Sequence, residues 1–186
     1  ELSTMFDPDK TRVVQLTQSY RSTQQVTDFT KHILKNGEAV TAFAREGELP
    51  TMTVAADEDA ALQKVIAQIK QNEEEDETTA IIGKDLADCR DLTEKLKAAG
   101  VAVTLIQSEN QRLAPGTIVV PSFLAKGLEF DGVVVWQASA SRYSADDERQ
   151  LLYTICSRAM HRLSIVAVEE LSPLLSDVPT DEYEMV

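Results

Sequence analysis

Short apolar runs alternate with longer amphipathic stretches along this chain of 186 residues. Short continuous apolar runs are typical of buried strands, whereas apolar residues that recur every three or four positions are typical of helices packed on a core. Their alternation predicts an α/β fold in which helices cover both faces of a mostly parallel sheet. Strands are expected at residues 13–16, 52–55, 79–82, 101–106, 117–120, 132–136 and 163–168.

Helices are expected at residues 23–35, after Asp57, at residues 86–99 and at residues 146–160. Ser22 and Gln25 have the spacing of a capping box for the first helix, and Gly100 is placed to end the third. The runs at 117–120 and 132–136 are apolar throughout, which indicates strands in the buried middle of the sheet.

The length and the apolar content of 43% fit one compact domain over residues 1–186. No run approaches the ~18–20 apolar residues of a membrane span, and the N-terminus lacks a secretory pattern, so a cytoplasmic protein is expected. Cys89 and Cys156 form no C-x-x-C pair, which gives no support to a disulfide framework or a zinc site. His32 and His161 have no nucleophile or metal ligand at a usable spacing, so no metal site is predicted.

Acidic residues exceed basic ones, and the formal net charge is -13 at pH 7. This balance excludes a generally cationic nucleic-acid surface, although a small basic groove is compatible with it. The acidic run at 73–77 is expected to be a solvated turn, and residues 177–186 are expected to form a flexible acidic tail.

Ligands of open parallel sheets bind at the carboxyl ends of strands, so the loops there are the first places to search. No G-x-x-x-x-G-K-[ST] loop occurs in the sequence, and a nucleotide bound here is therefore expected to be shared with another domain. The lack of a glycine-rich phosphate loop also argues against a standalone mononucleotide or dinucleotide enzyme.

The first informative segment is residues 16–23, with the sequence LTQSYRST, between an expected strand and an expected helix. Tyr20 can stack on a base, and Arg21 can hold two phosphate oxygens at once. The alternative is a surface arginine beside a tyrosine that packs on the sheet edge. The residues alone favour this alternative, because Tyr-Arg pairs are common.

The second segment is residues 119–130, with the sequence VVPSFLAKGLEF, between two strongly apolar runs. Gly127 allows a ligand to approach the backbone closely, and Glu129 can accept hydrogen bonds from a ribose hydroxyl. The alternative is a turn glycine followed by a solvated or helix-capping carboxylate.

The third segment is residues 148–159, with the sequence ERQLLYTICSRA, which is expected to be helical. Arg158 lies near its end, where a guanidinium on a rigid helix can stabilise the charge that develops on a transferring phosphoryl group. The alternative is an arginine that binds the last carbonyl groups of its own helix.

Together the three segments resemble motifs of UvrD/Rep-type superfamily 1 helicases, and they occur in the order of that family. QSYRST is similar to Q-N-Y-R-S-T, with Ser19 in place of Asn. AKGLEF is similar to the end of T-x-H-x-x-K-G-L-E-F, whereas Pro121 and Phe123 stand where the family has Thr and His. The third segment resembles E-E-E-R-R-L-x-Y-V-x-x-T-R-A, with Ser157 in place of Thr. The resemblance implies the second RecA-like motor domain of a longer ATP-dependent DNA helicase.

The resemblance also implies roles for single residues. Arg21 and Arg158 are expected to act on the γ-phosphate as catalytic residues, and Tyr20 is expected to stack on adenine. Ser122 and Phe123 are expected to contact single-stranded DNA, with Phe123 stacking on a base. The residues expected to bind ATP are Gln18, Tyr20, Lys126, Gly127 and Glu129. Mg²⁺ is expected to be held mainly by the first RecA-like domain of the same parent chain, so the fragment alone is expected to be inactive.

Only residues 107–116 separate two expected strands at the place where many family members carry a large accessory domain. This short link resembles the HelD branch, which is associated with RNA polymerase, and RNA polymerase is therefore an expected partner. The alternative function is a degenerate, non-catalytic motor module that docks on a protein partner. The presence of both Arg21 and Arg158 favours a working motor.

Overall fold

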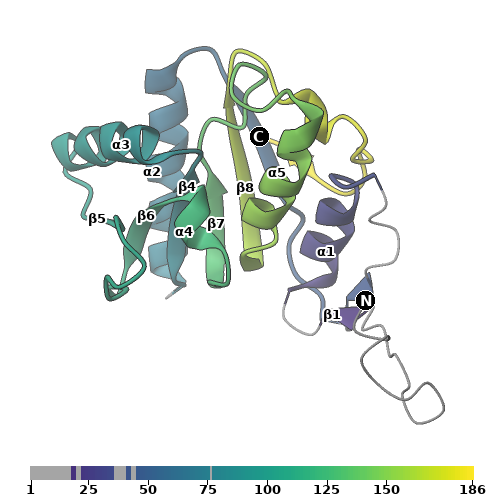
Figure 1. Cartoon of the computed structure of the whole chain (residues 1–186), viewed down its shortest axis with the longest axis horizontal. Coiled ribbons are helices and arrows are strands. Elements are labelled where there is room, and N and C mark those ends of the chain that lie inside the picture. The colour runs from purple at the N-terminus through teal and green to yellow at the C-terminus, as the bar shows by residue number, and fades with distance from the viewer. Residues whose placement is uncertain (1–17, 20–21, 36–40, 43–44, 76) are drawn as a thin grey trace, which may run out of the picture.

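The computed structural model describes residues 18–19, 22–35, 41–42, 45–75 and 77–186. Its main sheet has seven strands in the order β5-β6-β4-β7-β8-β3-β9, and every pair is parallel (Figure 1). The strands are β3 (Thr51–Ala55), β4 (Thr79–Gly83), β5 (Thr104–Leu105), β6 (Thr117–Pro121), β7 (Phe130–Val135), β8 (Ala159–Val168) and β9 (Glu184–Met185). The α/β class with a parallel sheet is thus confirmed.

A separate pair of short parallel strands, β1 (Gln18–Ser19) and β2 (Thr41–Ala42), lies near the N-terminal helix (Figure 1). The strand expected at 13–16 falls outside the described residues. The strand expected at 101–106 is shorter than predicted, because only Thr104 and Leu105 pair with β6.

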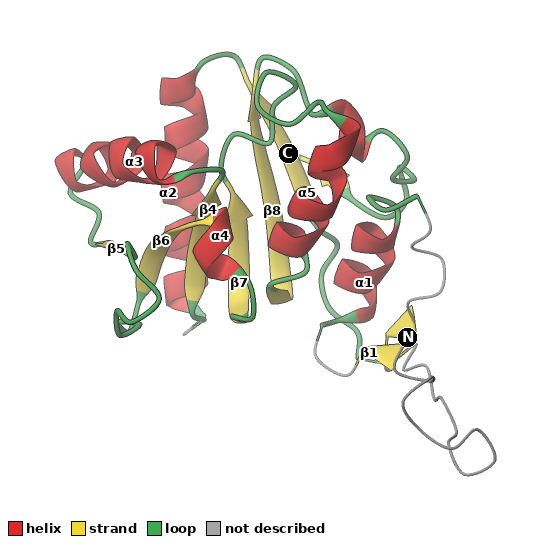
Figure 2. Ribbon diagram, in the orientation of Figure 1, coloured by secondary structure: helices red, strands yellow, loops and turns green. Residues whose placement is uncertain are grey.

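Helices cover both faces of the main sheet, as expected (Figure 2). The bounds are α1 (Gln24–Lys31), α2 (Glu58–Glu74), α3 (Leu86–Ala98), α4 (Ser122–Ala125) and α5 (Arg149–Cys156). Neighbouring residues of a strand enter different cores, since successive side chains point to opposite faces. Val120 packs in the core with α1, α4 and α5, whereas Val119 packs in the core with α2 and α3. Every residue of β6 is buried, and so is every residue of β7 except Asp131, which confirms the interior position of both strands.

The caps of α2 and α3 follow from the sequence. Asp57 and Asp85 each accept a hydrogen bond from the backbone N–H three residues later, at 2.8 Å in both cases. Gly100 follows α3 with a φ of 81°, the left-handed conformation that ends many helices. The capping box at Ser22 is wrong, because Thr23 caps α1 and the Ser22 hydroxyl is used elsewhere.

The helix expected at 146–160 is shorter and is followed at once by a strand. It consists of a 3₁₀ turn over Asp146–Glu148 and then α5. The strand β8 begins at Ala159, where the backbone pairs with Phe130 of β7. Arg158 therefore lies in the turn between α5 and β8 rather than within a helix.

The C-terminal segment is not the flexible tail that its acidic composition suggested. Its last strand, β9, pairs with β3. The Tyr183 ring meets the Phe29 ring edge-on at 6.5 Å between centroids. His32 Nε2 lies 2.9 Å from a Glu182 carboxylate oxygen. Backbone pairing and two side-chain contacts thus hold this segment on β3 and α1.

The acidic run at 73–77 is likewise more than a solvated turn. Its first residues belong to α2, which extends to Glu74. Glu75 and Glu77 both pair with Arg162 of β8, whose side chain is only 11% exposed. Glu75 and Glu77 therefore neutralise the charge of Arg162, which lies in the first half of β8.

Candidate functional site

The three segments of interest meet where β7 and β8 begin, a place we call the amino end of the sheet. The backbone N–H of Phe130 donates to the Arg158 carbonyl at 3.0 Å, which joins the second and third segments. The Ser22 hydroxyl donates to the Ala159 carbonyl at 2.9 Å, and the Thr23 N–H donates to the Met160 carbonyl at 3.0 Å. These two bonds bring the end of the first segment to the same place. The expectation that the informative loops lie at the carboxyl ends of strands is therefore wrong for the Lys-Gly loop, which precedes β7.

Arg158 is held by oxygen atoms that carry no formal charge. Its Nε donates to the Thr154 carbonyl at 3.0 Å, and its terminal nitrogens donate to the Leu128 carbonyl at 3.3 Å and the Ser157 hydroxyl at 3.2 Å. Binding to its own helix was the alternative interpretation, and the contact with Leu128 adds a link to the second segment. Within the described part of the chain, these bonds leave two of the five guanidinium N–H groups unused.

The Lys-Gly loop between α4 and β7 carries a second cation, Lys126, two residues before the Leu128 carbonyl that binds Arg158. The Lys126 side chain is exposed and forms no ion pair within the described residues. Gly127 has a φ of 82°, a conformation that residues with a side chain rarely adopt, and the space beside its Cα is open. Glu129 is exposed.

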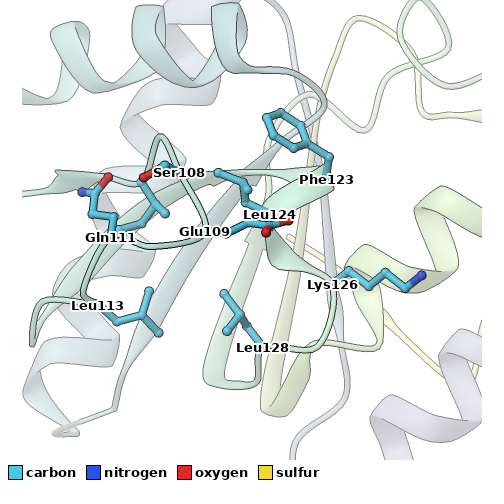
Figure 3. A pocket seen from close by; sticks show the side chains of 9 residues that line it. Ser108, Glu109, Gln111, Leu113, Phe123, Leu124, Lys126 and Leu128 are labelled. Carbon is cyan, nitrogen blue, oxygen red and sulfur yellow. The ribbon is translucent and has the colours of Figure 1, made fainter.

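Ser122 and Phe123 begin α4, at the carboxyl end of β6. Ser122 is 5% exposed and its hydroxyl donates to the Lys84 carbonyl at 2.6 Å, so it anchors α4 rather than facing a ligand. Phe123 is 60% exposed and lines a pocket of about 380 Å³ with Leu113 and Leu128 (Figure 3). Lys126 also lines this pocket, with the end of its side chain directed away from the other labelled residues (Figure 3). A large exposed aromatic ring is suited to stacking on a base.

Three of the expected site residues cannot be placed. Tyr20 and Arg21 lie outside the described residues. The backbone of Gln18 belongs to β1, and its side chain is not described.

A second cluster of charges, absent from the sequence-based predictions, lies at the carboxyl end of the sheet. There Lys84 pairs with Glu148, and Arg142 pairs with Asp88. The hydrogen bond from Lys84 is the first cause that keeps the pKa of Glu148 below its usual range. The sequence carried no spacing signal for this cluster, because its members come from two segments that are distant in the sequence, residues 84–88 and 142–148.

The histidines lie beside carboxylates, and the cysteines lie in the core. His32 lies beside Glu182, and His161 Nδ1 lies 3.4 Å from a Glu77 carboxylate oxygen. Burial raises the pKa of the Cys89 thiol to about 12 and also raises the pKa of the Cys156 thiol, so both stay protonated in the core. Among the described residues, no group of three or more His, Cys, Asp or Glu side chains is placed to hold a metal ion. None of the helices in that part of the chain has the length and apolar character needed to cross a membrane.

Comparisons with known proteins agree with this arrangement. A model of the UvrD-like helicase C-terminal domain matches residues 118–166. The C-terminal domain of a possible DNA helicase from Lactobacillus plantarum WCFS1 is 59% identical over 90% of this chain and 98% of its own, with a TM-score of 0.81. No curated protein matches the chain.

Two structures of the arterivirus helicase, nonstructural protein 10, are far more distant. One was solved with DNA, is 11% identical and overlaps with a TM-score of 0.43 over 87% of this chain and 36% of its own. The other is 12% identical, with a TM-score of 0.45 over 86% of this chain and 36% of its own. Neither overlap is strong enough to support an inference about this chain.

The matched residues include the Lys-Gly loop, Arg158, the strand β7 and most of β8. The parallel seven-stranded sheet is RecA-like. The close relative is matched over nearly its whole length, and the UvrD-like model matches the part of the chain where the second and third segments lie. The chain therefore belongs to the family of UvrD-like helicase C-terminal domains.

Proposed function

We propose that this chain is the second motor domain of an ATP-dependent DNA helicase or translocase. It supplies Arg158 and Arg21 to an ATP site shared with the first motor domain of the same parent protein. Gln18, Tyr20, Lys126, Gly127 and Glu129 contribute to nucleotide binding. The first domain provides the phosphate loop and most of the Mg²⁺ ligands, because this sequence contains no G-x-x-x-x-G-K-[ST] loop.

The observation that carries the proposal is the setting of Arg158. Its described partners are two carbonyl groups and a hydroxyl, so its positive charge is not cancelled by a carboxylate. It lies at the end of a rigid helix and is joined to the Lys-Gly loop through Leu128. A guanidinium that is fixed in place and still charged is suited to stabilise negative charge as a phosphoryl group is transferred.

The Lys-Gly loop supports the same assignment. Lys126 forms no ion pair within the described residues, so a second positive charge is open to an anionic ligand on this side of the domain. At Gly127 no side chain blocks the approach of a ligand to the backbone. ATP, when bound, supplies the phosphoryl group, and these residues orient it and balance its charge.

The test is ATP hydrolysis by the full-length protein and by the 186-residue chain, each with and without single-stranded DNA. We expect hydrolysis that DNA stimulates in the full-length protein and none in the chain alone, since half of the phosphate-binding groups belong to the other domain. A full-length protein that does not hydrolyse ATP would contradict the proposal and favour the non-catalytic module.

The chain alone is also expected to bind single-stranded DNA weakly at physiological salt, because its net charge is -13. Phe123 is its candidate contact with a base. Fluorescence anisotropy with a labelled oligonucleotide measures this affinity. The HelD-like branch and RNA polymerase as a partner stay predictions, with which the short 106–116 link between β5 and β6 is compatible.

A further inference from the structure

Lys84 follows β4 directly and fixes the start of α4 through its backbone. Its carbonyl accepts the hydroxyl hydrogen of Ser122 at 2.6 Å. Ser122 is the first residue of α4, and the next residue is the exposed Phe123. A displacement of α4 by a ligand on Phe123 therefore acts directly on the Lys84 carbonyl.

The side chain of Lys84 fixes the start of α5. Its ammonium group pairs with Glu148, donates to the Arg142 carbonyl at 2.5 Å and lies 5.2 Å from the centre of the Tyr143 ring. The side chains of Lys84 and Glu148 are 29% and 22% exposed, so water screens this pair less than it screens a surface pair.

Glu148 is in turn bound to the backbone that leads into α5. One of its carboxylate oxygens accepts the N–H groups of Ser144 and Ala145 at 3.0 and 3.1 Å. Glu148 thus ties Lys84 to the chain immediately before Arg149, the first residue of α5.

α5 connects this anchor to Arg158. The helix has eight residues, which corresponds to about 12 Å at the rise of an α-helix. Leu152, Ile155 and Cys156 are fully buried, and Arg158 Nε is bonded to the Thr154 carbonyl. A packed helix of this length moves as a unit, so a shift at Glu148 changes the position of the guanidinium.

We propose that Lys84 is a positioning residue that couples α4, on the nucleic-acid side of the domain, to Arg158 at the ATP site. Its carbonyl is bonded to Ser122 and therefore moves with α4. Its ammonium group is paired with Glu148, so the same movement reaches the start of α5. This coupling rests on the proposed function. It gives a route by which DNA bound near Phe123, at the carboxyl end of β6, can change hydrolysis at Arg158, at the amino end of β8.

The experiment measures ATP turnover by the full-length protein with and without saturating oligothymidine. In Lys84→Met the ratio of stimulated to unstimulated turnover is expected to fall about tenfold through kcat, with little change in KM for ATP. Lys84→Arg is expected to restore most of the ratio, because it keeps a cation within reach of Glu148. The matched control is Lys35→Met, which removes the Lys35–Asp146 pair at the same helix start. That pair is 65% and 62% exposed and makes no described contact with α4, so the ratio is expected to stay normal.

A double-mutant comparison tests the route. Glu148→Gln keeps an oxygen that can accept the Ser144 and Ala145 N–H groups but loses the charge, so it is expected to behave like Lys84→Met. The double variant is expected to be no worse than either single variant, since both break one link. If Lys84→Met fails to fold by circular dichroism, Glu148→Gln decides the matter.

The outcomes separate the two proposals. A wild-type protein whose hydrolysis DNA does not stimulate would overturn the proposed function and the coupling with it. Stimulated hydrolysis in the wild type that Lys84→Met or Glu148→Gln leaves unchanged would overturn the coupling alone. Additive losses of the stimulation ratio in the double variant would also overturn the coupling, because Lys84 and Glu148 would then act independently.

Discussion

The arginines at the two ends of α5 have different kinds of hydrogen-bond partner. At the first residue of the helix, Arg149 Nε lies 2.6 Å from the Asp146 carboxylate, and one of its terminal nitrogens donates to the Ile33 carbonyl at 3.3 Å. Just beyond the other end, Arg158 is held by carbonyl and hydroxyl oxygens and meets no carboxylate among the described residues. The first arginine is neutralised and joins α5 to the segment after α1, whereas the second is oriented while its charge stays available. The kind of partner, more than the presence of an arginine, is what makes Arg158 rather than Arg149 the candidate for a catalytic role.

The strongest way to break this comparison is Arg158→Ala in the full-length protein. We expect ATP turnover to fall by ~10² or more with folding nearly intact, because the lost interaction acts mainly on transition-state charge. Arg158→Lys should restore little, since lysine lacks the planar fork that holds two oxygens at once. Steady-state kinetics with circular dichroism as a folding control measures this. Near-normal turnover in Arg158→Ala would remove the residue from the catalytic site.

Arg149→Ala is the matched change at the other end of the helix. It should lower the free energy of unfolding by about 1 kcal/mol, because an ion pair, a bond to the Ile33 carbonyl and the packing of the side chain are lost. Turnover of the full-length protein should stay within about twofold of the wild type, a change worth less than ~0.5 kcal/mol. Urea denaturation of the chain supplies the stability value. A loss of turnover as large as that of Arg158→Ala would mean that the two ends do not differ in role.

Gly127→Ala tests the loop that contacts Arg158 through Leu128. A left-handed residue other than glycine costs roughly 1 kcal/mol, and the new Cβ meets no atom within 4 Å, so the cost is purely conformational. Gly116→Ala is the control, since Gly116 has a φ of 95° and is equally open. Thermal unfolding should show similar losses for both variants, and only Gly127→Ala should also raise KM for ATP. Equal KM values for ATP in Gly127→Ala and Gly116→Ala would contradict a nucleotide contact at this loop.

The smallest expected effect is on the stability of the fold at low pH. The folded-state pKa of Glu148 is lowered, first by the hydrogen bond from Lys84. A lowered pKa means that the stabilisation is present above the ordinary carboxyl pKa of about 4.3 and is lost as pH falls through the lower folded value. Between about pH 5 and 3, the wild type should therefore lose slightly more stability in urea than Glu148→Gln does. Equal losses would show that this carboxylate does not help to anchor α5.

Much of the fold could be predicted because local signals agreed with it. The Asp caps and the apolar faces of α2 and α3 are readable in short windows, and the interior strands β6 and β7 are continuously apolar. The start of β8 could not be predicted. Residues 159–162 are mixed in polarity, and their strand conformation depends on pairing with β7, which is distant in sequence.

The geometry of the candidate site could be predicted in part. The resemblance pointed to the second and third segments, but the sequence placed the Lys-Gly loop at the carboxyl end of a strand. The helix α4 has only four residues, which is too short to show a helical period in the sequence. The sequence therefore could not predict that the chain runs through α4 back to the amino end of the sheet. The charges around Lys84 were missed for a different reason, since contacts between distant segments leave no spacing pattern.

The pairing of β9 with β3 has a consequence for how the protein behaves in solution. Glu184 N–H donates to the Pro50 carbonyl at 2.9 Å, and Val186 N–H donates to the Met52 carbonyl at 3.0 Å. Without these last residues, the outer backbone groups of β3 face water as an open row, onto which a strand of another molecule can add. Residues 179–186, which belong to the stretch expected to be a flexible tail, therefore cover part of this edge of β3. A chain ending at residue 178 should form concentration-dependent oligomers that the intact chain does not.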